Sequence, residues 1–211
     1  MARMSLTTFL FNDCVDSVTR TTRLAKYLEE PGGRDYHWAA KHAASRLFEE
    51  DIPYDQAVAE VMTNMTRAHQ RADNQEALKA IHSWKQANPG LSHAPPVGEV
   101  TGPLGQLTIV LKPTFALERK GAITAYVPWM FKDVRLTPKI AGIGVHLLEL
   151  GLQAGPYEDW RFALFDTVTK KTFSRTHKNT AEAAHFLIRS QEEQLVAQKS
   201  RKSEEQEDRL T

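Results

Sequence analysis

Several features that would narrow the function at once are scarce or missing in this sequence. Its 211 residues include one cysteine, Cys14, so no disulfide can close within the chain and a thiol-rich metal site is excluded. No run reaches the ~20 apolar residues of a membrane span. The start of the chain also lacks the apolar core of a secretory signal. We therefore expect a cytoplasmic protein that does not associate with membranes.

A surplus of charge of one sign is missing as well. The chain has 27 lysines and arginines against 26 aspartates and glutamates, and its 41% apolar and 25% charged residues are ordinary for a globular protein. Proteins that bind nucleic acid or anionic lipid through overall charge carry a large positive surplus, because neutralising phosphate supplies most of their non-specific affinity. Any nucleic-acid binding by this chain must therefore come from a local patch.

Apolar residues recur at helical spacing over residues 1–88, which predicts a domain of about four helices. These helices are predicted over residues 12–30, 35–50, 54–71 and 73–88. Asp35 and Pro53 are suited to the first turns of the second and third helices. Asp73 and Glu76 have the spacing of a capping box for the fourth. The next segment, 89–105, contains eight prolines and glycines and is predicted to be an extended linker.

The apolar period changes to two in the second half of the chain. Strands are predicted over 107–111 and 123–127, around a turn at 118–121, and a helix follows from Thr137. A second unit of the same kind has strands at 160–164 and 172–175 and a helix from Thr180. The fold class predicted for the whole chain is α+β. Residues 106–198 are predicted to form a two-layer α/β sandwich (ββα-ββα) with a four-stranded, mainly antiparallel sheet. Residues 199–211 are predicted to form a flexible charged tail.

The alternation along the predicted strands separates two faces of the sheet. The residues expected to face the two helices of the sandwich are Leu107, Ile109, Ile123, Val127, Phe162 and Leu164. The opposite face carries two aromatic and two cationic side chains, from Lys112, Tyr126, Arg161 and Phe165. We expect first that the N-terminal helices cover this opposite face. An uncovered face would instead pair with another protein, or would stack unpaired bases on its aromatic rings.

No set of residues points to a particular catalytic chemistry. The eight histidines lack ligand spacing, no serine stands in a nucleophile elbow, and the acids beside Cys14 disfavour its thiolate. Glu118 and Lys120 resemble the acid and lysine of a metal-dependent nuclease, with Glu99 or Asp133 as a second acid, but a charged hairpin turn explains this pair better. The turn at 32–35 precedes a helix and could bind an anion. We expect no metal and no cofactor.

The sequence favours a non-enzymatic macromolecular interaction or regulatory module, whose partner is another protein or a second copy of the chain. The alternative is a nucleic-acid-binding protein, including a metal-dependent nuclease, that uses the sheet face and the basic turns. Its binding residues would be Lys112, Arg119, Lys120, Tyr126, Arg161 and Phe165. A third hypothesis is a hydrolase that uses the turn at 32–35. The catalytic residues of such an enzyme are not identified by the sequence.

Overall fold

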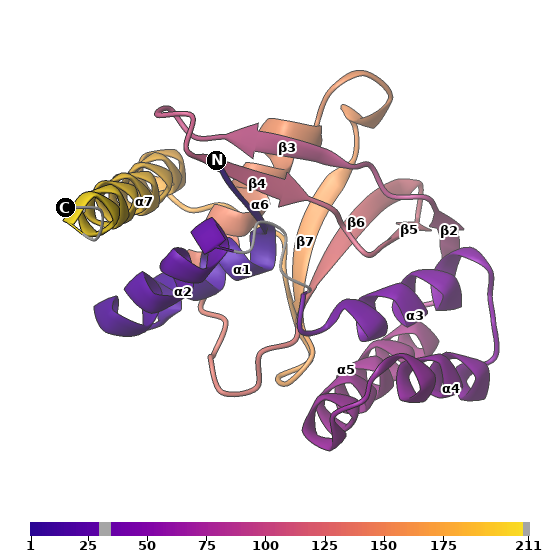
Figure 1. Ribbon diagram of the computed structural model, residues 1–211. Coiled ribbons are helices and arrows are strands. Elements are labelled where there is room, and N and C mark those ends of the chain that lie inside the picture. The colour runs from indigo at the N-terminus through magenta and orange to yellow at the C-terminus, as the bar shows by residue number, and fades with distance from the viewer. Residues whose placement is uncertain (30–34, 209–211) are drawn as a thin grey trace.

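A computed structural model describes residues 1–29 and 35–208, which form two β-sheets and seven α-helices (Figure 1). The N-terminal elements are β1 (Ala2–Ser5), α1 (Leu6–Cys14), α2 (Ser17–Glu29), α3 (Trp38–Glu49), α4 (Tyr54–Asn64) and α5 (Ala68–Ala87). The strands that follow are β2 (Leu91–His93), β3 (Gly98–Thr101), β4 (Leu107–Leu111), β5 (Phe115–Arg119) and β6 (Ala122–Trp129). The chain continues with α6 (Pro138–Leu152), β7 (Arg161–Asp166), β8 (Lys171–Phe173) and α7 (Thr180–Asp208).

The larger sheet has five strands in the order β2-β5-β6-β7-β8. Its neighbours are antiparallel except for β6 and β7, which are parallel and joined by the crossover helix α6. The smaller sheet has the order β1-β4-β3, with β1 parallel and β3 antiparallel to β4. The chain therefore passes between the two sheets twice in this half, from β2 to β3 and from β4 to β5.

Both faces of the five-stranded sheet are buried, which gives the molecule three layers. Residues such as Val127 and Leu164 pack in one core with α1, α2, α6, α7 and the smaller sheet. Their alternating neighbours, Tyr126 and Phe165, pack in a second core with α3, α4 and α5, the layer at the lower right of Figure 1. For the residues of β6 and β7 this separation matches the predicted faces, because strand geometry has a period of two whatever covers each face. The predicted faces also included Leu107, Ile109 and Lys112, which do not belong to this sheet.

The α+β class is confirmed, but the predicted sheet and domain layout are corrected. The sheet has five strands instead of four, and residues 107–111 belong to the other sheet. The turn at 118–121 is correct, with Gly121 at φ 75°, but the strand that enters it is β5. Residues 1–88 do not form one helical unit, since β1, α1 and α2 belong to one core and α3–α5 to the other.

The proposed linker, 89–105, contains β2 and β3. Its prolines at 95 and 96 lie between these strands, and Gly98 allows β3 to approach α6: a Cβ there would lie 2.8 Å from the carbonyl oxygen of Gly151. The glycines and prolines therefore fit short edge strands instead of a spacer.

Helix boundaries also differ from the prediction. The expected first helix is two helices, because the Asp16 carboxylate accepts the amides of Val18 and Thr19 and begins a new one. The fourth helix begins at Ala68, so Asp73 lies within α5 and does not cap it.

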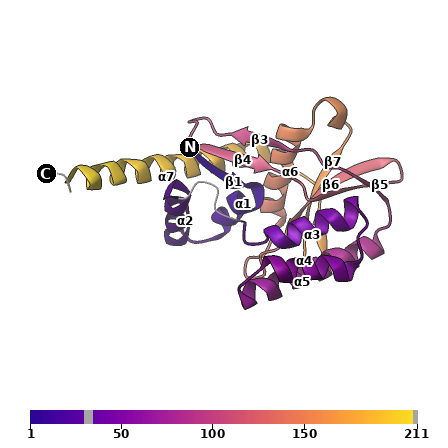
Figure 2. The ribbon, with the colours of Figure 1, turned by 45° about the vertical axis from the view of Figure 1, so that its right-hand side comes forward.

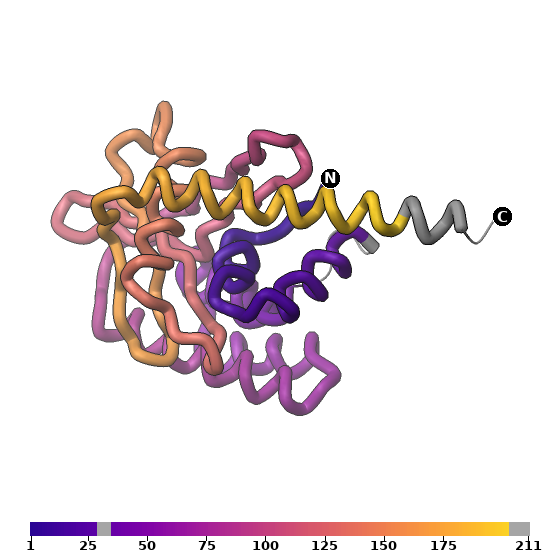
Figure 3. The backbone as a smooth tube through the Cα atoms, turned by 90° about the vertical axis from the view of Figure 1, so that its left-hand side faces the viewer, coloured from indigo at the N-terminus to yellow at the C-terminus, as the bar shows by residue number. Residues whose placement is uncertain are grey.

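The C-terminal helix α7 runs past α2 and extends away from the body (Figures 2 and 3). The fully buried Glu192 carboxylate holds it there by accepting the amides of Leu104, Gln106 and Leu107 at 2.7–3.1 Å. Residues 199–208 continue this helix, whereas the rest of the predicted tail lies outside the described residues. Within the described part of the chain, no helix combines the length and apolarity needed to cross a bilayer.

Candidate binding cleft along α3

The structure does not bring the six predicted binding residues together. Tyr126 and Phe165 are 6% and 0% exposed, and the ring of Trp84 from α5 covers both, with centroid distances of 4.8 and 5.4 Å. The aromatic stacking surface that the nucleic-acid hypothesis needs is therefore inside the protein. This finding agrees with the expectation that the protein's own helices cover the face.

The four predicted cations lie at opposite ends of the sheet. Arg119 and Lys120 form the β5–β6 turn, and Arg161 begins β7 near the same end. Lys112 precedes β5, at the end of the sheet where β6 finishes. The Arg119 guanidinium donates to Asn88 at 2.7 Å. These positions form no continuous basic track.

The acids considered for a nuclease are also separated. Glu118 pairs with His93 at 3.0 Å on the large sheet, whereas Glu99 pairs with Arg3 at 2.7 Å on the small one. In the described ranges, no group of three or more histidines, cysteines, aspartates and glutamates could hold a metal ion. Of the turn at 32–35, only Asp35 lies within the described residues.

The structure brings together a different set of residues, in a cleft of about 610 Å³ beside α3. One wall is a face of α3 and the segment that leads into it, with Asp35, Trp38, Lys41, His42, Ser45 and Glu49. The other wall consists of the two connections between the sheets, with Ala94, Pro95, Val97, Lys112, Pro113 and Thr114. We call this the α3 cleft. Of the six predicted binding residues, Lys112 is the one that lines this cleft, which also contains Asp35 from the predicted turn at 32–35.

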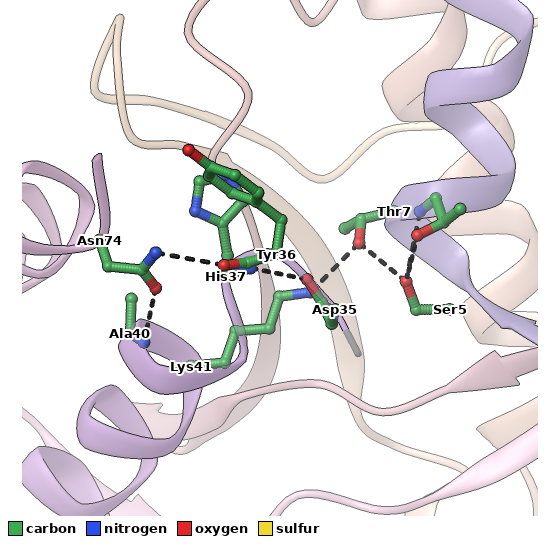
Figure 4. Close-up of polar contacts among 9 residues, drawn as sticks. Ser5, Thr7, Asp35, Tyr36, His37, Ala40, Lys41 and Asn74 are labelled. Carbon is green, nitrogen blue, oxygen red and sulfur yellow. Dashed lines mark hydrogen bonds and ion pairs between the residues drawn. The ribbon is translucent and has the colours of Figure 1, made fainter. Parts of the chain in front are cut away.

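A chain of polar contacts begins at Asp35 and Lys41 of the α3 cleft (Figure 4). The Lys41 ammonium lies 2.5 Å from the Asp35 carboxylate and donates to the Thr7 hydroxyl at 3.2 Å. Thr7 in turn lies 3.1 Å from the hydroxyl of Ser5, which caps α1 by accepting the Thr8 amide. This chain ties the start of α1 to the start of α3, two elements that belong to different cores.

The ion pair between Asp35 and Lys41 decides whether Lys41 could act as a base toward Thr7. Burial alone would raise the pKa of Asp35, but the charge and hydrogen bond of Lys41, together with the His37 amide, hold that pKa below its usual value. In this pair the Lys41 ammonium has no lone pair with which to take a proton from Thr7. The contact between Lys41 and Thr7 is therefore not the pair of nucleophile and base that hydrolysis requires.

Behind the cleft, α5 supplies the cap of α3. The fully buried Asn74 accepts the Ala40 amide at 3.0 Å and donates to the carbonyl of Tyr36 at 3.2 Å. His37, which is 4% exposed, lies beside it, and its Nδ1 atom has no hydrogen-bond partner among the described residues. Burial, reinforced by the Lys41 charge, lowers the pKa of His37 to about 4 despite the opposing carboxylates of Asp35 and Asp73. The ring is therefore neutral near pH 7.

Most of this cleft could not be predicted from the sequence, because its walls come from three separate segments. Trp38 packs against the core that α3, α4 and α5 share, and its half-buried ring also lines the cleft. One signal was present: Trp38, Lys41, Ser45 and Glu49 recur at helical spacing on the side of α3 that faces away from Ala43 and Leu47. No family model matches this chain, and comparisons with curated proteins and with solved structures found no match either.

Proposed function

We propose that this protein is a macromolecular interaction module and that it binds an extended segment of a partner protein in the α3 cleft. The observation that carries the proposal is the composition of the cleft walls. The half-buried Trp38 and Pro95 and the buried Pro113 line them, together with Val97, which is 64% exposed. Exposed apolar side chains beside an aromatic anchor are typical of surfaces at which a partner's apolar groups become buried.

The charges of the cleft specify the partner further. The Asp35 carboxylate is neutralised by Lys41, and Glu49 accepts the Ser45 hydroxyl at 2.9 Å. Lys112 is exposed and makes no ion pair with the described residues. A partner segment that places a carboxylate near Lys112 and an apolar side chain against Trp38 would complement both features.

Crosslinking from within the cleft tests this proposal. The photoreactive residue p-benzoylphenylalanine at Val97 is expected to crosslink one protein segment in native cells, identified by mass spectrometry. The same residue at Leu150, which is also 64% exposed, is the matched control. Identical crosslinks from both positions, or recovery of nucleic acid in place of protein from Val97, would overturn the proposal.

Direct titration of the captured segment sharpens the test. A synthetic peptide of that segment should bind the wild-type chain, and Lys112→Glu should weaken binding by about tenfold or more because it replaces an attraction by a repulsion. Lys120→Glu makes the same charge change at the β5–β6 turn and should leave the affinity unchanged. Equal losses in the two variants would show that overall charge, and not the α3 cleft, determines binding.

A further inference from the structure

A second cleft lies where the parallel strands β6 and β7 end. It has a volume of about 290 Å³ and is bounded by α5, by the residues that follow β6 and by the β7–β8 turn. Parallel neighbours end at the same edge of a sheet, and their continuing chains separate there. For this reason open α/β sheets bind ligands preferentially at the carboxyl ends of their strands. This position is separate from the α3 cleft.

Three ammonium groups from three different elements line this second cleft. They belong to Lys79 of α5, Lys132 after β6 and Lys170 of the β7–β8 turn. Lys132 is paired with Asp73 at 2.7 Å. Lys79 and Lys170 make no ion pair with residues that the structure describes, and both are exposed. We call this site the lysine cleft.

The acids of the lysine cleft do not cancel these charges. The Asp73 carboxylate is already occupied, since it accepts the Tyr36 hydroxyl at 2.7 Å in addition to Lys132. Burial alone would raise its pKa, but these two hydrogen bonds and the Lys132 charge hold the pKa of Asp73 below its usual value. Glu76 is the remaining acid in the lining. Two ammonium groups therefore stand against one carboxylate.

The turn that carries Lys170 is fixed by the sheet. The Asp166 carboxylate, 2% exposed, accepts the amides of Val168 and Thr169 at 2.9 and 3.2 Å. The Thr167 hydroxyl donates to the carbonyl of Trp129 on β6 at 3.0 Å. These bonds join the ends of the two strands and hold the turn beside Lys132. The cations are thus carried by an ordered frame, as tight anion binding requires.

We propose that the lysine cleft binds a small organic anion with at least two negative charges, a phosphate ester or a di- or tricarboxylate. The free ammonium groups supply the attraction, and Lys132 joins them when the anion competes with Asp73. Ala77, Ala80, Met130 and Val168 provide apolar contacts for the carbon frame of the ligand. The volume suits a molecule of this size and not a folded partner.

Titration of the full chain with pyrophosphate and with citrate at constant ionic strength tests this site. Saturable binding of one anion per chain is expected for at least one of them, and acetate serves as the monovalent control. Tighter binding of pyrophosphate would specify a phosphate ester, and tighter binding of citrate a polycarboxylate. Absence of saturable binding for both, up to about 10 mM, would overturn the proposal, because sites weaker than this contribute less than about 3 kcal/mol.

Variants that remove positive charge and a variant that removes negative charge test whether the anion binds in the lysine cleft. The double change Lys79→Ala/Lys170→Ala should weaken the anion by about tenfold or more, and Glu76→Gln should strengthen it several-fold by removing a repulsion. Lys26→Ala/Lys120→Ala removes the same charge from exposed sites and should change nothing. All of these positions are surface lysines or polar residues, so circular dichroism should be unaltered. Equal weakening in the two double variants, or no gain in Glu76→Gln, would contradict a specific site.

Discussion

The two faces of the five-stranded sheet are packed by different means. On one face, α6 approaches α1 and the sheet closely through glycine. A Cβ built on Gly144 would lie 2.8 Å from Leu10 Cδ1 of α1 and 2.9 Å from Leu164 Cδ1 of β7. On the α3–α5 side, aromatic rings fill the space, and Phe115 stacks on Phe48 with centroids 3.9 Å apart. That side also contains fully buried Asn74. The α6 side is therefore closely packed at Gly144, whereas the α3–α5 side joins stacked rings to the buried amide of Asn74.

The polar contacts on this side connect the two proposed sites, one of which borders α3 and the other α5. Buried polar groups are favourable only when each has a partner, so Asn74 fixes the position of α3 relative to α5. The segment Asp35–His37 then places Asp35 in the α3 cleft, while Tyr36 bonds Asp73 in the lysine cleft. The α6 side reaches the α3 cleft through α1, where the Thr7 hydroxyl accepts a hydrogen bond from Lys41 at 3.2 Å.

The largest expected effect concerns His37 and the pH dependence of stability. Its pKa is about 4 in the folded protein and 6.5 in the unfolded chain, so between these values the unfolded chain binds the extra proton. The contribution of neutral His37 to the free energy of unfolding is therefore fully present above pH 6.5 and is lost as the pH falls towards 4. A difference of this size corresponds to about 3 kcal/mol.

Urea unfolding of wild type and His37→Phe at several pH values checks this prediction. Other groups contribute equally to both proteins, so the difference in unfolding free energy should change by about 3 kcal/mol across the window. His69→Phe is the matched control, because His69 also lies near Tyr36 but is exposed. A pH profile of His37→Phe that parallels wild type would show that His37 protonates without penalty in the fold.

The second prediction concerns Asn74. Asn74→Ala leaves the Ala40 amide and the Tyr36 carbonyl without their partner inside the protein, which should cost about 2 kcal/mol. Gln86→Ala, at an exposed position on the same helix, should change the free energy of unfolding by less than about 0.5 kcal/mol. Equal stability of Asn74→Ala and wild type would mean that water replaces the amide, and that α5 does not fix α3.

The sequence could predict the elements whose signals are local. The hairpin turn is one, because Lys120 and Gly121 both take positive φ, and the start of α6 is another, because the Thr137 hydroxyl accepts the Ile140 amide. The short strands β1, β2 and β3 have three or four residues each, and they are stable only through pairing with β4 or β5. Which strand pairs with which is a non-local property that no window of sequence contains.

The same reason separates the site residues that could be predicted from those that could not. Lys112 was predicted from the alternation of residues 107–111, on the face opposite Leu107 and Ile109. Lys41 and Pro95 line the same cleft, but only the fold brings α3 beside the β2–β3 connection. The sequence predicted that helices would cover Tyr126. It could not predict that the covering ring belongs to Trp84, because that contact depends on where α5 packs.

The smallest expected effect lies on the α6 side. Gly144→Ala should gain up to about 1 kcal/mol of helix propensity but lose more through overpacking, because the new methyl meets Leu10 and Leu164 at 2.8–3.0 Å; the net cost is about 1 kcal/mol. Gly142→Ala lies on the same helix with its nearest neighbour at 3.2 Å, so it should be neutral or slightly stabilising. Thermal unfolding of the two variants separates the gain in helix propensity from the cost of overpacking. If Gly144→Ala were as stable as Gly142→Ala, the α6 interface would yield to a methyl group, and close packing would not distinguish this face from the other.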